Sequence, residues 1–377
     1  GEGQLARVRA AKTVDYDPVG ALKGRALDVA WRHFRDRELS RGSDRARAFE
    51  GFCRREAAWL DGFVMFRALK DAHGQRPWWE WPAALRDRDP AALDAARAAH
   101  ADALGRQCYA QWVAHTQWDA ARAALKARGV EVMGDLPFMV GRDSADVWAE
   151  RGEFRDDASV GVPADQFDPD GQEWGLPPYR WQAMRGNGFR WLRRRARYAG
   201  ERYDRFRIDH LVGFFRTYMR DVGRIRGANG KLLPGYFDPA DEAAQRVHGE
   251  AVIGAMKDAA GEPGADLVAE DLGVIPDFVR PALVGLDVPG YKVLVWERDG
   301  LVYRDPAAYP ARSVACFGTH DTDPVAAWWE ALPEVDRAAV QRLPRLAGPS
   351  QGGRFGRGFT PEVHTALLGL LAHARSE

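Results

Sequence analysis

Two patterns of apolar residues divide the chain. In the first, apolar residues recur at helical spacing within residues 21–34, 46–69 and 91–129. In the second, short apolar runs alternate with amphipathic helical stretches. These patterns predict a mostly helical subdomain over residues 1–118, followed by a region of alternating strands and helices over residues 119–377.

The apolar runs of the second region are predicted strands. Strands that alternate with helices form a parallel sheet, either doubly wound or closed into a (β/α) barrel. Parallel strands are covered on both faces, which is why the runs are continuously apolar. The predicted strands are residues 130–137, 204–210, 266–270, 290–296 and 313–319.

Acidic residues stand at the ends of four of these runs. In a (β/α) barrel the carboxyl ends of the strands meet at one mouth, where the active site lies. An acid after a strand can also cap the next helix. Capping does not account for Glu270, nor for Arg207 and His320, which lie beside two of the other acids. The four acids are Asp135, Asp209, Glu270 and Asp321.

Charge and cysteine usage exclude several classes of protein. Lys plus Arg equals Asp plus Glu at 54 each, and this balance argues against a nucleic-acid or membrane-surface partner. No apolar run approaches the ~20 residues of a membrane span. Cys53, Cys108 and Cys316 are odd in number and far apart in the sequence, which argues against a disulfide framework or zinc site and is typical of a reducing cytoplasm. We expect no metal and no cofactor.

Tryptophan is abundant, with 14 residues in a chain of 377. Such side chains either fill the core or present flat faces that stack on the apolar C–H surfaces of sugar rings. Composition alone leaves both interpretations open.

Six short motifs follow one another along the chain. They are GDLP (134–137), WGLPPY (174–179), FRIDH (206–210), AEDLG (269–273), PGYKVL (289–294) and GTHDTD (318–323). Their order resembles that of the amylomaltases, which form glycoside hydrolase family 77 of the α-amylase superfamily. The resemblance runs from about Val14 to near the C-terminus.

The resemblance implies a catalytic triad of acids. Asp209 corresponds to the nucleophile, Glu270 to the general acid/base, and Asp321 to an acid that binds ring hydroxyls and stabilises the transition state. Cleavage of a glycosidic bond with retention uses two such carboxyl groups roughly 5–5.5 Å apart.

The resemblance also implies residues that bind substrate. Arg207 would hold the nucleophile ionised and oriented, because a nearby positive charge favours the charged form. Asp135 corresponds to an acid of the substrate site, His320 to a hydrogen-bond partner beside the third acid, and Trp174 to a loop that lines the sugar-binding groove. The chain departs from the family's usual WGNPLY and THDND, which bears on donor and acceptor preference.

The function implied is that of a 4-α-glucanotransferase, which passes a segment of a 1,4-α-glucan through a covalent glycosyl-Asp intermediate to a new 4-hydroxyl. Its partner would be an α-1,4-glucan or a maltooligosaccharide. An α-amylase-like hydrolase with the same acids and water as acceptor is the alternative. A third hypothesis is a non-catalytic glucan-binding or scaffold protein. The intact set of acids argues against it, because binding alone needs no nucleophile.

The fold implied is a (β/α)8 barrel that is incomplete in this chain. Amylomaltases have two barrel strands before the matching region and one after it, so the five runs would be strands three to seven. Residues 1–118 would be a helical insertion and residues 119–377 the catalytic part of the barrel. The whole enzyme would have roughly 500 residues, and a groove without three strands is expected to bind glucan poorly.

Overall fold

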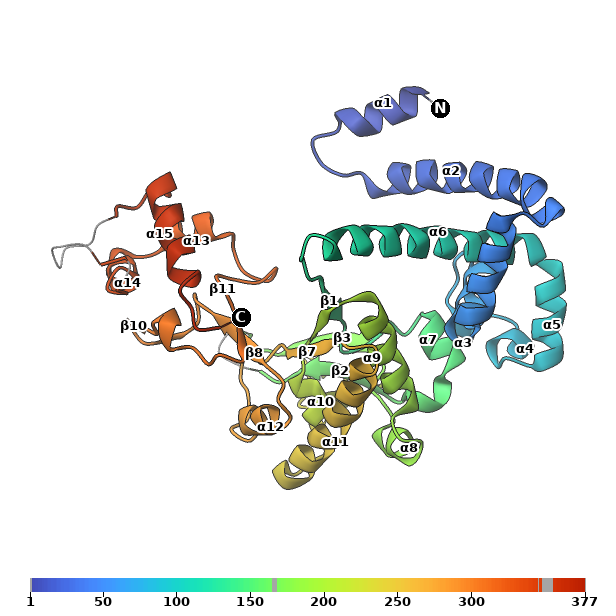
Figure 1. The fold of residues 1–377 in the computed structure, drawn as a ribbon. Coiled ribbons are helices and arrows are strands. Elements are labelled where there is room, and N and C mark those ends of the chain that lie inside the picture. Colours follow the sequence, from blue (N-terminus) through green and yellow to red (C-terminus); the bar gives the residue numbers. More distant parts are fainter. Residues whose placement is uncertain (1, 165–167, 345, 348–354, 377) are drawn as a thin grey trace. The chain divides into compact units, whose positions relative to one another are not determined.

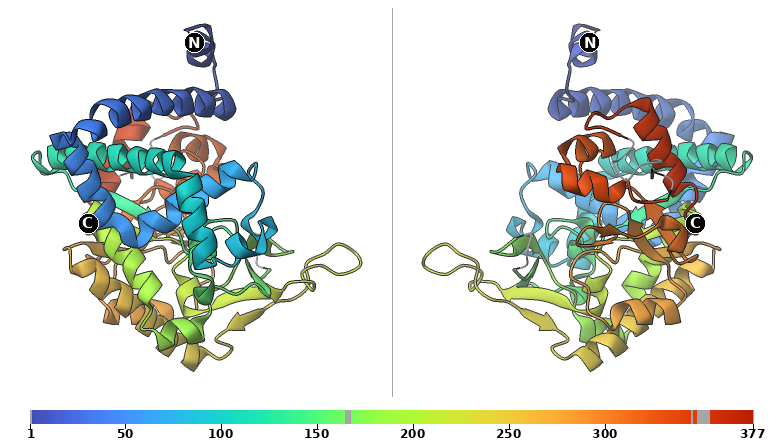
Figure 2. Two further views of the ribbon diagram at one scale, coloured as in Figure 1. Left: turned by 90° about the vertical axis from the view of Figure 1, so that its right-hand side faces the viewer. Right: turned by 90° about the vertical axis from the view of Figure 1, so that its left-hand side faces the viewer.

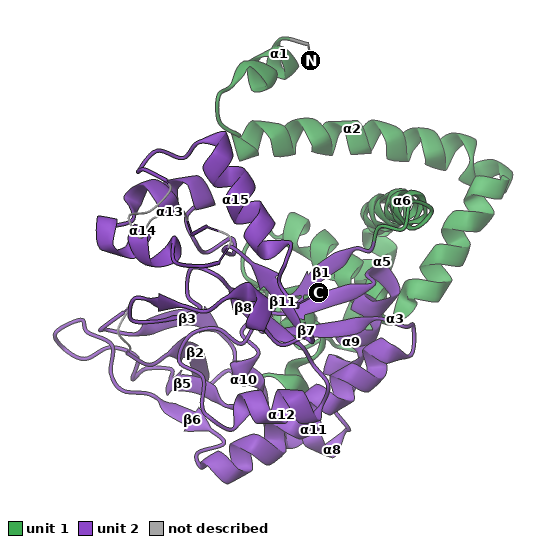
Figure 3. Ribbon diagram, turned by 60° about the vertical axis from the view of Figure 1, so that its left-hand side comes forward, with its two compact units in different colours: residues 1–130, 140–155 green, residues 131–139, 156–377 purple. Residues whose placement is uncertain are grey.

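The structure is a computed structural model that describes residues 2–164, 168–344, 346–347 and 355–376 (Figures 1 and 2). It divides into two compact units that interlace in the sequence. One unit comprises residues 1–130 and 140–155, and the other residues 131–139 and 156–377 (Figure 3). Across the described ranges, no helix is both long and apolar enough to cross a membrane.

Helices build the first unit, as the apolar spacing predicts. Ser43 begins one of them by accepting a hydrogen bond from the Ala46 N–H, and Asp89 begins another in the same way, with Pro90 in its first turn. The helices are α1 (Glu2–Ala10), α2 (Tyr16–Arg37), α3 (Asp44–Ala72), α4 (Ala83–Arg86), α5 (Pro90–Ala99), α6 (Ala101–Lys126) and α7 (Ala145–Ala149), with 3-10 turns η1 (Leu39–Arg41), η2 (Trp78–Glu80) and η3 (Arg151–Glu153).

An aromatic cluster joins α2, α3 and α6. Phe34 of α2 lies 4.9 Å from the ring of Tyr109 and 5.4 Å from that of Phe49, and it is 2% exposed. Trp31 packs on the same rings and donates its indole N–H to Asp102. Aromatic pairs at these separations add to the stability gained by burial. Core packing is therefore the role of Trp31.

Two of the cysteines meet in this unit. Cys53 on α3 and Cys108 on α6 are both partly buried against the same core clusters, although they are far apart in the sequence. Both are free thiols, as is Cys316 in the second unit.

A five-stranded parallel sheet is the centre of the second unit, and it confirms the predicted α/β class and the five predicted strands. The spatial order of the strands follows their order in the chain. Gly129, at a φ of 70°, ends the preceding helix and turns the chain toward the first strand. The strands are β1 (Met133–Leu136), β4 (Arg205–Ile208), β7 (Asp266–Ala269), β8 (Gly290–Val293) and β11 (Ser313–Cys316).

Two long helices pack side by side on this sheet (Figure 1). They are α9 (Arg190–Arg202), which contacts β1 and β4, and α11 (Glu242–Gly261), which contacts β7. Asp241 begins α11 by accepting a hydrogen bond from Ala244. The other described helices of this unit are shorter. They are α8 (Trp181–Gly186), α10 (Val212–Phe215), α12 (Val279–Gly285), α13 (Val325–Ala331), α14 (Glu334–Val340), α15 (Pro361–Leu371) and the 3-10 turn η4 (Pro306–Ala308).

A second sheet of four antiparallel strands lies in the same unit, and the sequence does not predict it. Its order is β3-β2-β5-β6, and the connection between β5 and β6 extends away from the sheet (Figure 2). Its strands are β2 (Ala158–Val162), β3 (Gln172–Leu176), β5 (Thr217–Asp221) and β6 (Tyr236–Asp238). A short ribbon of β9 (Arg298–Asp299) and β10 (Val302–Tyr303) is also present.

The prediction that Trp174 lies in a loop is wrong. Trp174 lies within β3, which pairs with β2 across a register shift between Val160 and Gly161. The glycines and prolines around this tryptophan are typical of a loop, but the backbone hydrogen bonds to β2 hold the segment as a bulged edge strand.

We predict that Phe34→Ala destabilises the helical unit by about 3–5 kcal/mol, because it leaves a cavity among four aromatic rings. Urea unfolding followed by tryptophan fluorescence measures the change. Val29→Ala, on the same helix but 60% exposed, is the control and should cost less than about 0.5 kcal/mol. Equal midpoints for the two variants would contradict this role of the cluster.

Candidate active site

The register of the parallel sheet brings three of the predicted acids to neighbouring strand ends. Asp135 on β1 is opposite Arg207 on β4. Asp209 and Glu270 are the first residues after β4 and β7, and both continue the strand pairing, since their N–H groups donate to Leu136 and Ile208. The carboxyl ends of parallel strands thus collect these side chains at one edge.

Arg207 links two of the acids. One guanidinium nitrogen lies 2.9 Å from both carboxylate oxygens of Asp135, and another lies 2.7 Å from Oδ1 of Asp209. Its side chain is only 9% exposed. Burial acts to lower the pKa of Arg207, but the hydrogen bond to Asp135 and the surrounding carboxylates outweigh it and raise the pKa. A permanently charged guanidinium therefore lies against both carboxylates.

Glu270 has a different environment. Burial raises its pKa to about 7, although the charge of Arg207 and a hydrogen bond from the His210 N–H oppose the shift. That N–H lies 2.7 Å from Oε2 of Glu270. The raised pKa of Glu270 is a property that its sequence motif does not reveal.

His210 positions the glutamic acid with its backbone. The residue has a φ of 42°, a left-handed conformation that is uncommon for a residue other than glycine and that recurs at functional turns. Its ring contacts Phe138 at 5.4 Å and Trp174 at 5.0 Å between centroids. Burial lowers the pKa of His210 to about 4, so the imidazole is neutral. Trp174 thus contacts His210, the residue that follows Asp209 and whose N–H binds Glu270.

Tyr291 on β8 is a site residue that the sequence analysis missed. Burial raises the pKa of its hydroxyl to about 12, and the charges of Arg207, Asp135 and Glu270 act on it. The only signal in the sequence was its place in the motif at residues 289–294. A neutral hydroxyl near these groups can donate a hydrogen bond to a carboxylate or to a sugar oxygen.

Asp271 is a structural acid. It is 5% exposed, its Oδ1 accepts a hydrogen bond from the Tyr291 N–H, and Arg280 donates to its Oδ2. Gly290 leaves room for the carboxylate, because a Cβ there would lie 2.5 Å from Oδ1. Strands β7 and β8 are paired only at Ala269 and Gly290 in the described ladder, and Asp271 extends this connection by one residue.

Asp321 and His320 are not brought into contact with the other acids. They follow β11, which is separated from β7 by β8. Among the described residues, the contacts of Asp321 lie in its own turn: its N–H donates to Thr319, and its carboxylate is 3.4 Å from Nε2 of His320. Their side chains are 71% and 67% exposed.

The two carboxyl groups have different environments. A guanidinium binds Asp209, whereas burial raises the pKa of Glu270 to about 7. Carboxyl groups in such different environments are typical of paired nucleophiles and general acids. Fold and site together define an α/β protein with two carboxyl groups at adjacent ends of parallel strands.

Comparison with known proteins identifies the family. The chain belongs to glycoside hydrolase family 77, whose family model, described as 4-alpha-glucanotransferase, matches residues 1–377. It is 34% identical over 339 residues to the 4-alpha-glucanotransferase of Thermus thermophilus, covering 87% of this chain and 64% of that protein. It is 31% identical over 299 residues to the chloroplastic/amyloplastic 4-alpha-glucanotransferase of Solanum tuberosum, covering 75% of this chain and 48% of that protein.

The fold has a solved counterpart. The amylomaltase of Streptococcus agalactiae in complex with acarbose matches 96% of this chain and 70% of its own, with 27% sequence identity and a TM-score of 0.79. The chain thus spans less than two thirds of the length of the curated relatives given above.

We predict that Glu270→Gln stabilises the protein at pH 8 by about 1–3 kcal/mol. A carboxyl group with a raised folded-state pKa contributes full stability below its unfolded pKa of 4.5 and loses it as the pH rises through about 7. The amide resembles the protonated acid and still accepts the His210 N–H. Denaturant unfolding at pH 4 and pH 8 measures the difference, which should vanish at pH 4.

Glu334→Gln, at an exposed position in the same unit, is the matched control and should show no such dependence on pH. A glutamine variant at residue 270 that is less stable than wild type at pH 8 would contradict the neutral-acid assignment.

Proposed function

We propose that this chain is the catalytic part of a 4-α-glucanotransferase with a retaining mechanism. The observation that carries the proposal is the pair formed by Asp209, bound to Arg207, and Glu270, with its raised pKa, at adjacent ends of β4 and β7. Membership of glycoside hydrolase family 77 supports the choice of α-1,4-glucans and maltooligosaccharides as substrates.

In this mechanism Asp209 attacks the anomeric carbon of the donor glucan. Arg207 holds one carboxylate oxygen through a hydrogen bond of 2.7 Å, which leaves the other oxygen to form the glycosyl ester. Glu270 donates its proton to the leaving oxygen as the bond between the two sugars breaks.

The second half of the cycle reverses the roles. A 4-hydroxyl of the acceptor attacks the glycosyl ester, Glu270 takes its proton, and the bond to Asp209 breaks. Because the pKa of Glu270 is about 7, both directions of proton transfer have little cost at neutral pH. The acid is then protonated again and ready for the next donor.

The remaining candidates bind the sugar in this proposal. Asp135 has a half-exposed carboxylate beyond Arg207, and Trp174 presents an indole ring beside His210. Asp321 and His320 have exposed polar groups that would bind ring hydroxyls of the donor when the glucan is in place. Hydrogen bonds that strengthen in the transition state would be their contribution to the rate.

Hydrolysis is the alternative reaction of the same acids. It differs only in that water takes the place of the acceptor 4-hydroxyl. The glucanotransferase names of the relatives favour transfer.

Incubation with maltotriose tests the proposal. Transfer gives glucose together with maltopentaose, whereas hydrolysis gives glucose and maltose without longer products. Asp209→Ala should reduce product formation by at least about a thousandfold, since both steps need the nucleophile. Asp277→Ala, an exposed acid in the same unit, is the control. Turnover by Asp209→Ala within tenfold of wild type would assign the nucleophile to another residue.

The rate should also depend on pH in a particular direction. We predict that kcat/KM for maltotriose falls as the pH rises through about 7, because the raised pKa of Glu270 sets the point at which the acid is lost. Initial rates between pH 5 and pH 9 measure this limb. A rate that stays constant to pH 9 would contradict the role of Glu270 as the proton donor.

A further inference from the structure

A row of arginines on α9 lines a groove that the mechanism above does not use. The row consists of Arg190, Arg193, Arg194 and Arg197, and their spacing of three and four residues places them on one face of the helix. The groove has a volume of 430 Å³, which is within the range of about 300–1,000 Å³ that is usual for small-molecule sites. Like charges at this spacing destabilise a helix, so helix formation does not explain the row.

The opposite face of α9 fixes the direction of this row. Trp191, Leu192 and Ala196 are buried there, and the helix packs on β1, β4 and α11. Arg193 is anchored as well, because one of its guanidinium nitrogens donates to the Ala255 carbonyl of α11 at 3.1 Å. The arginines are therefore presented by a firmly packed element, which reduces the entropy that is lost when a ligand binds.

Arg195 shows what a purely structural arginine of the same run looks like. Its guanidinium carbon lies 4.7 Å from the centre of the Trp191 ring, and it donates to the Pro137 carbonyl at 2.9 Å. Packing accounts for this side chain, and Arg195 is absent from the described lining of the groove. The run of three arginines at residues 193–195 thus divides into one that joins α9 to the end of β1 and two that line the groove.

Positive charge exceeds negative charge in the lining of the groove. Glu262, just beyond α11, is the one acidic residue in its described lining. Two arginines share this carboxylate, since Arg197 lies 2.5 Å from Oε2 and Arg193 lies 3.9 Å from Oε1. One carboxylate does not balance four guanidinium groups, so the groove attracts an anion.

The chemistry of the donors favours a phosphate group. A guanidinium presents planar N–H donors in a fixed fork that matches phosphate oxygens, which is why arginine is common where phosphate is recognised. Asn187, Gly188 and Ala259 form the rest of the wall and are uncharged. A Cβ added at Gly188 would meet no heavy atom within 4 Å, so space remains at this end for a neutral organic part beside the anion.

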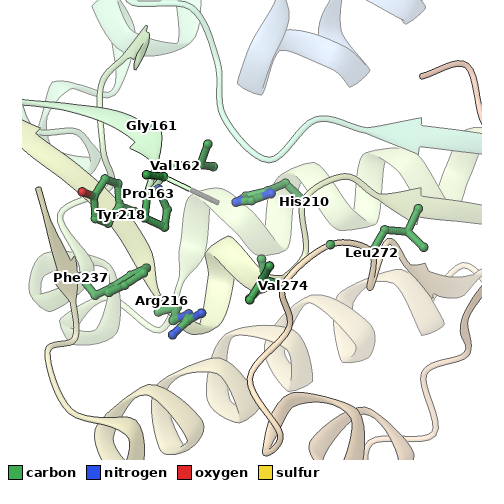
Figure 4. Close-up of a pocket in the computed structure, with 12 residues that line it drawn as sticks. Gly161, Val162, Pro163, His210, Arg216, Tyr218, Phe237, Leu272 and Val274 are labelled. Carbon is green, nitrogen blue, oxygen red and sulfur yellow. The ribbon is translucent and has the colours of Figure 1, made fainter. Parts of the chain in front are cut away.

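Size and charge favour a small ligand over a nucleic acid. A nucleic acid binds through an extended basic surface, whereas this chain has 54 basic and 54 acidic residues and the excess in question lies within a single groove. The cavity beside His210, shown in Figure 4, shares no described lining residue with the groove. A ligand of the groove would therefore bind outside the candidate active site.

We propose that this groove binds the phosphate group of a small phosphate ester, with the four arginines of the row as donors. Arg193 and Arg197 also hold Glu262, whose charge sets how strongly the groove attracts the anion. The site is separate from the glucan chemistry proposed above and does not depend on it.

Calorimetric titration with glucose 6-phosphate tests the proposal, and titration with glucose measures any binding that the sugar alone contributes. The double variant Arg190→Gln/Arg194→Gln removes two donors and retains both ion pairs of Glu262. We expect it to weaken the binding of glucose 6-phosphate at least about tenfold, since the lost hydrogen bonds are made to a charged group. Binding of glucose should be unchanged, and added salt should weaken the binding of the ester to wild type, because exposed charges are screened.

Two further variants are matched controls. Arg246→Gln removes an exposed arginine of α11 outside the described lining and should leave the affinity unchanged. Glu262→Gln removes the acid of the groove and should tighten binding about two- to fivefold, because it takes away a charge that repels phosphate. Opposite shifts from the arginine and glutamate variants cannot come from a loss of folding, which circular dichroism checks independently.

Several results would overturn the inference. An affinity of the double variant within about twofold of wild type, or an equal loss in Arg246→Gln, would exclude the groove as the site. Equal affinity of wild type for inorganic phosphate would reduce the groove to a general anion site, and equal affinity for citrate would remove the preference for phosphate. Absence of ester binding to wild type would also overturn it, and double-stranded DNA that then bound wild type but not the double variant would assign the row to a nucleic acid.

Discussion

The site depends on one buried cation. Arg207 is almost fully enclosed and reaches Asp135 on one neighbouring strand and Asp209 beyond the end of its own strand. Taking a guanidinium out of water is costly, and here two carboxylates offset the cost. The same contacts fix the register of β1 against β4 and the orientation of the proposed nucleophile. Loss of either acid would leave the buried Arg207 guanidinium with one carboxylate in place of two. The two acids therefore stabilise the fold at this edge as well as forming the site.

The contrast between Asp209 and Glu270 follows from their distance to that cation. Both are the first residue after a parallel strand, and both continue the strand hydrogen bonds. Asp209 receives the guanidinium directly, whereas Glu270 receives backbone N–H groups, including that of His210, and is more deeply enclosed. For Glu270, the cost of burying a charge exceeds the attraction of Arg207. Two acids in equivalent positions of adjacent strands thus have different electrostatic environments.

How much of this could be predicted from the sequence depends on the kind of interaction. The five parallel strands and the acids that end them were predictable, because apolar runs and strand-end placement are local patterns. The antiparallel sheet was not, since none of its strands is a continuous apolar run and two of them contain a glycine. The N–H of His210 is a backbone donor, which no side-chain motif records. The meeting of Cys53 with Cys108 and the partial burial of Tyr291 are tertiary effects, which appear only when distant segments pack.

The two sheets of the second unit divide the work in a way that bears on specificity. The parallel sheet carries Arg207, Asp209 and Glu270 at its strand ends, whereas the antiparallel sheet carries Trp174 on β3 and Phe237 on β6. The departures from the usual family motif at residues 176 and 178 lie in or just after β3, outside the strands that hold the carboxyl pair. Under the proposed function, a change in the antiparallel sheet would alter contacts to the sugar without moving Arg207, because the backbone pairing of β1 with β4 holds Arg207 opposite Asp135. Under the proposed function, acceptor preference could therefore diverge within the family while the acid pair and its charges stayed constant.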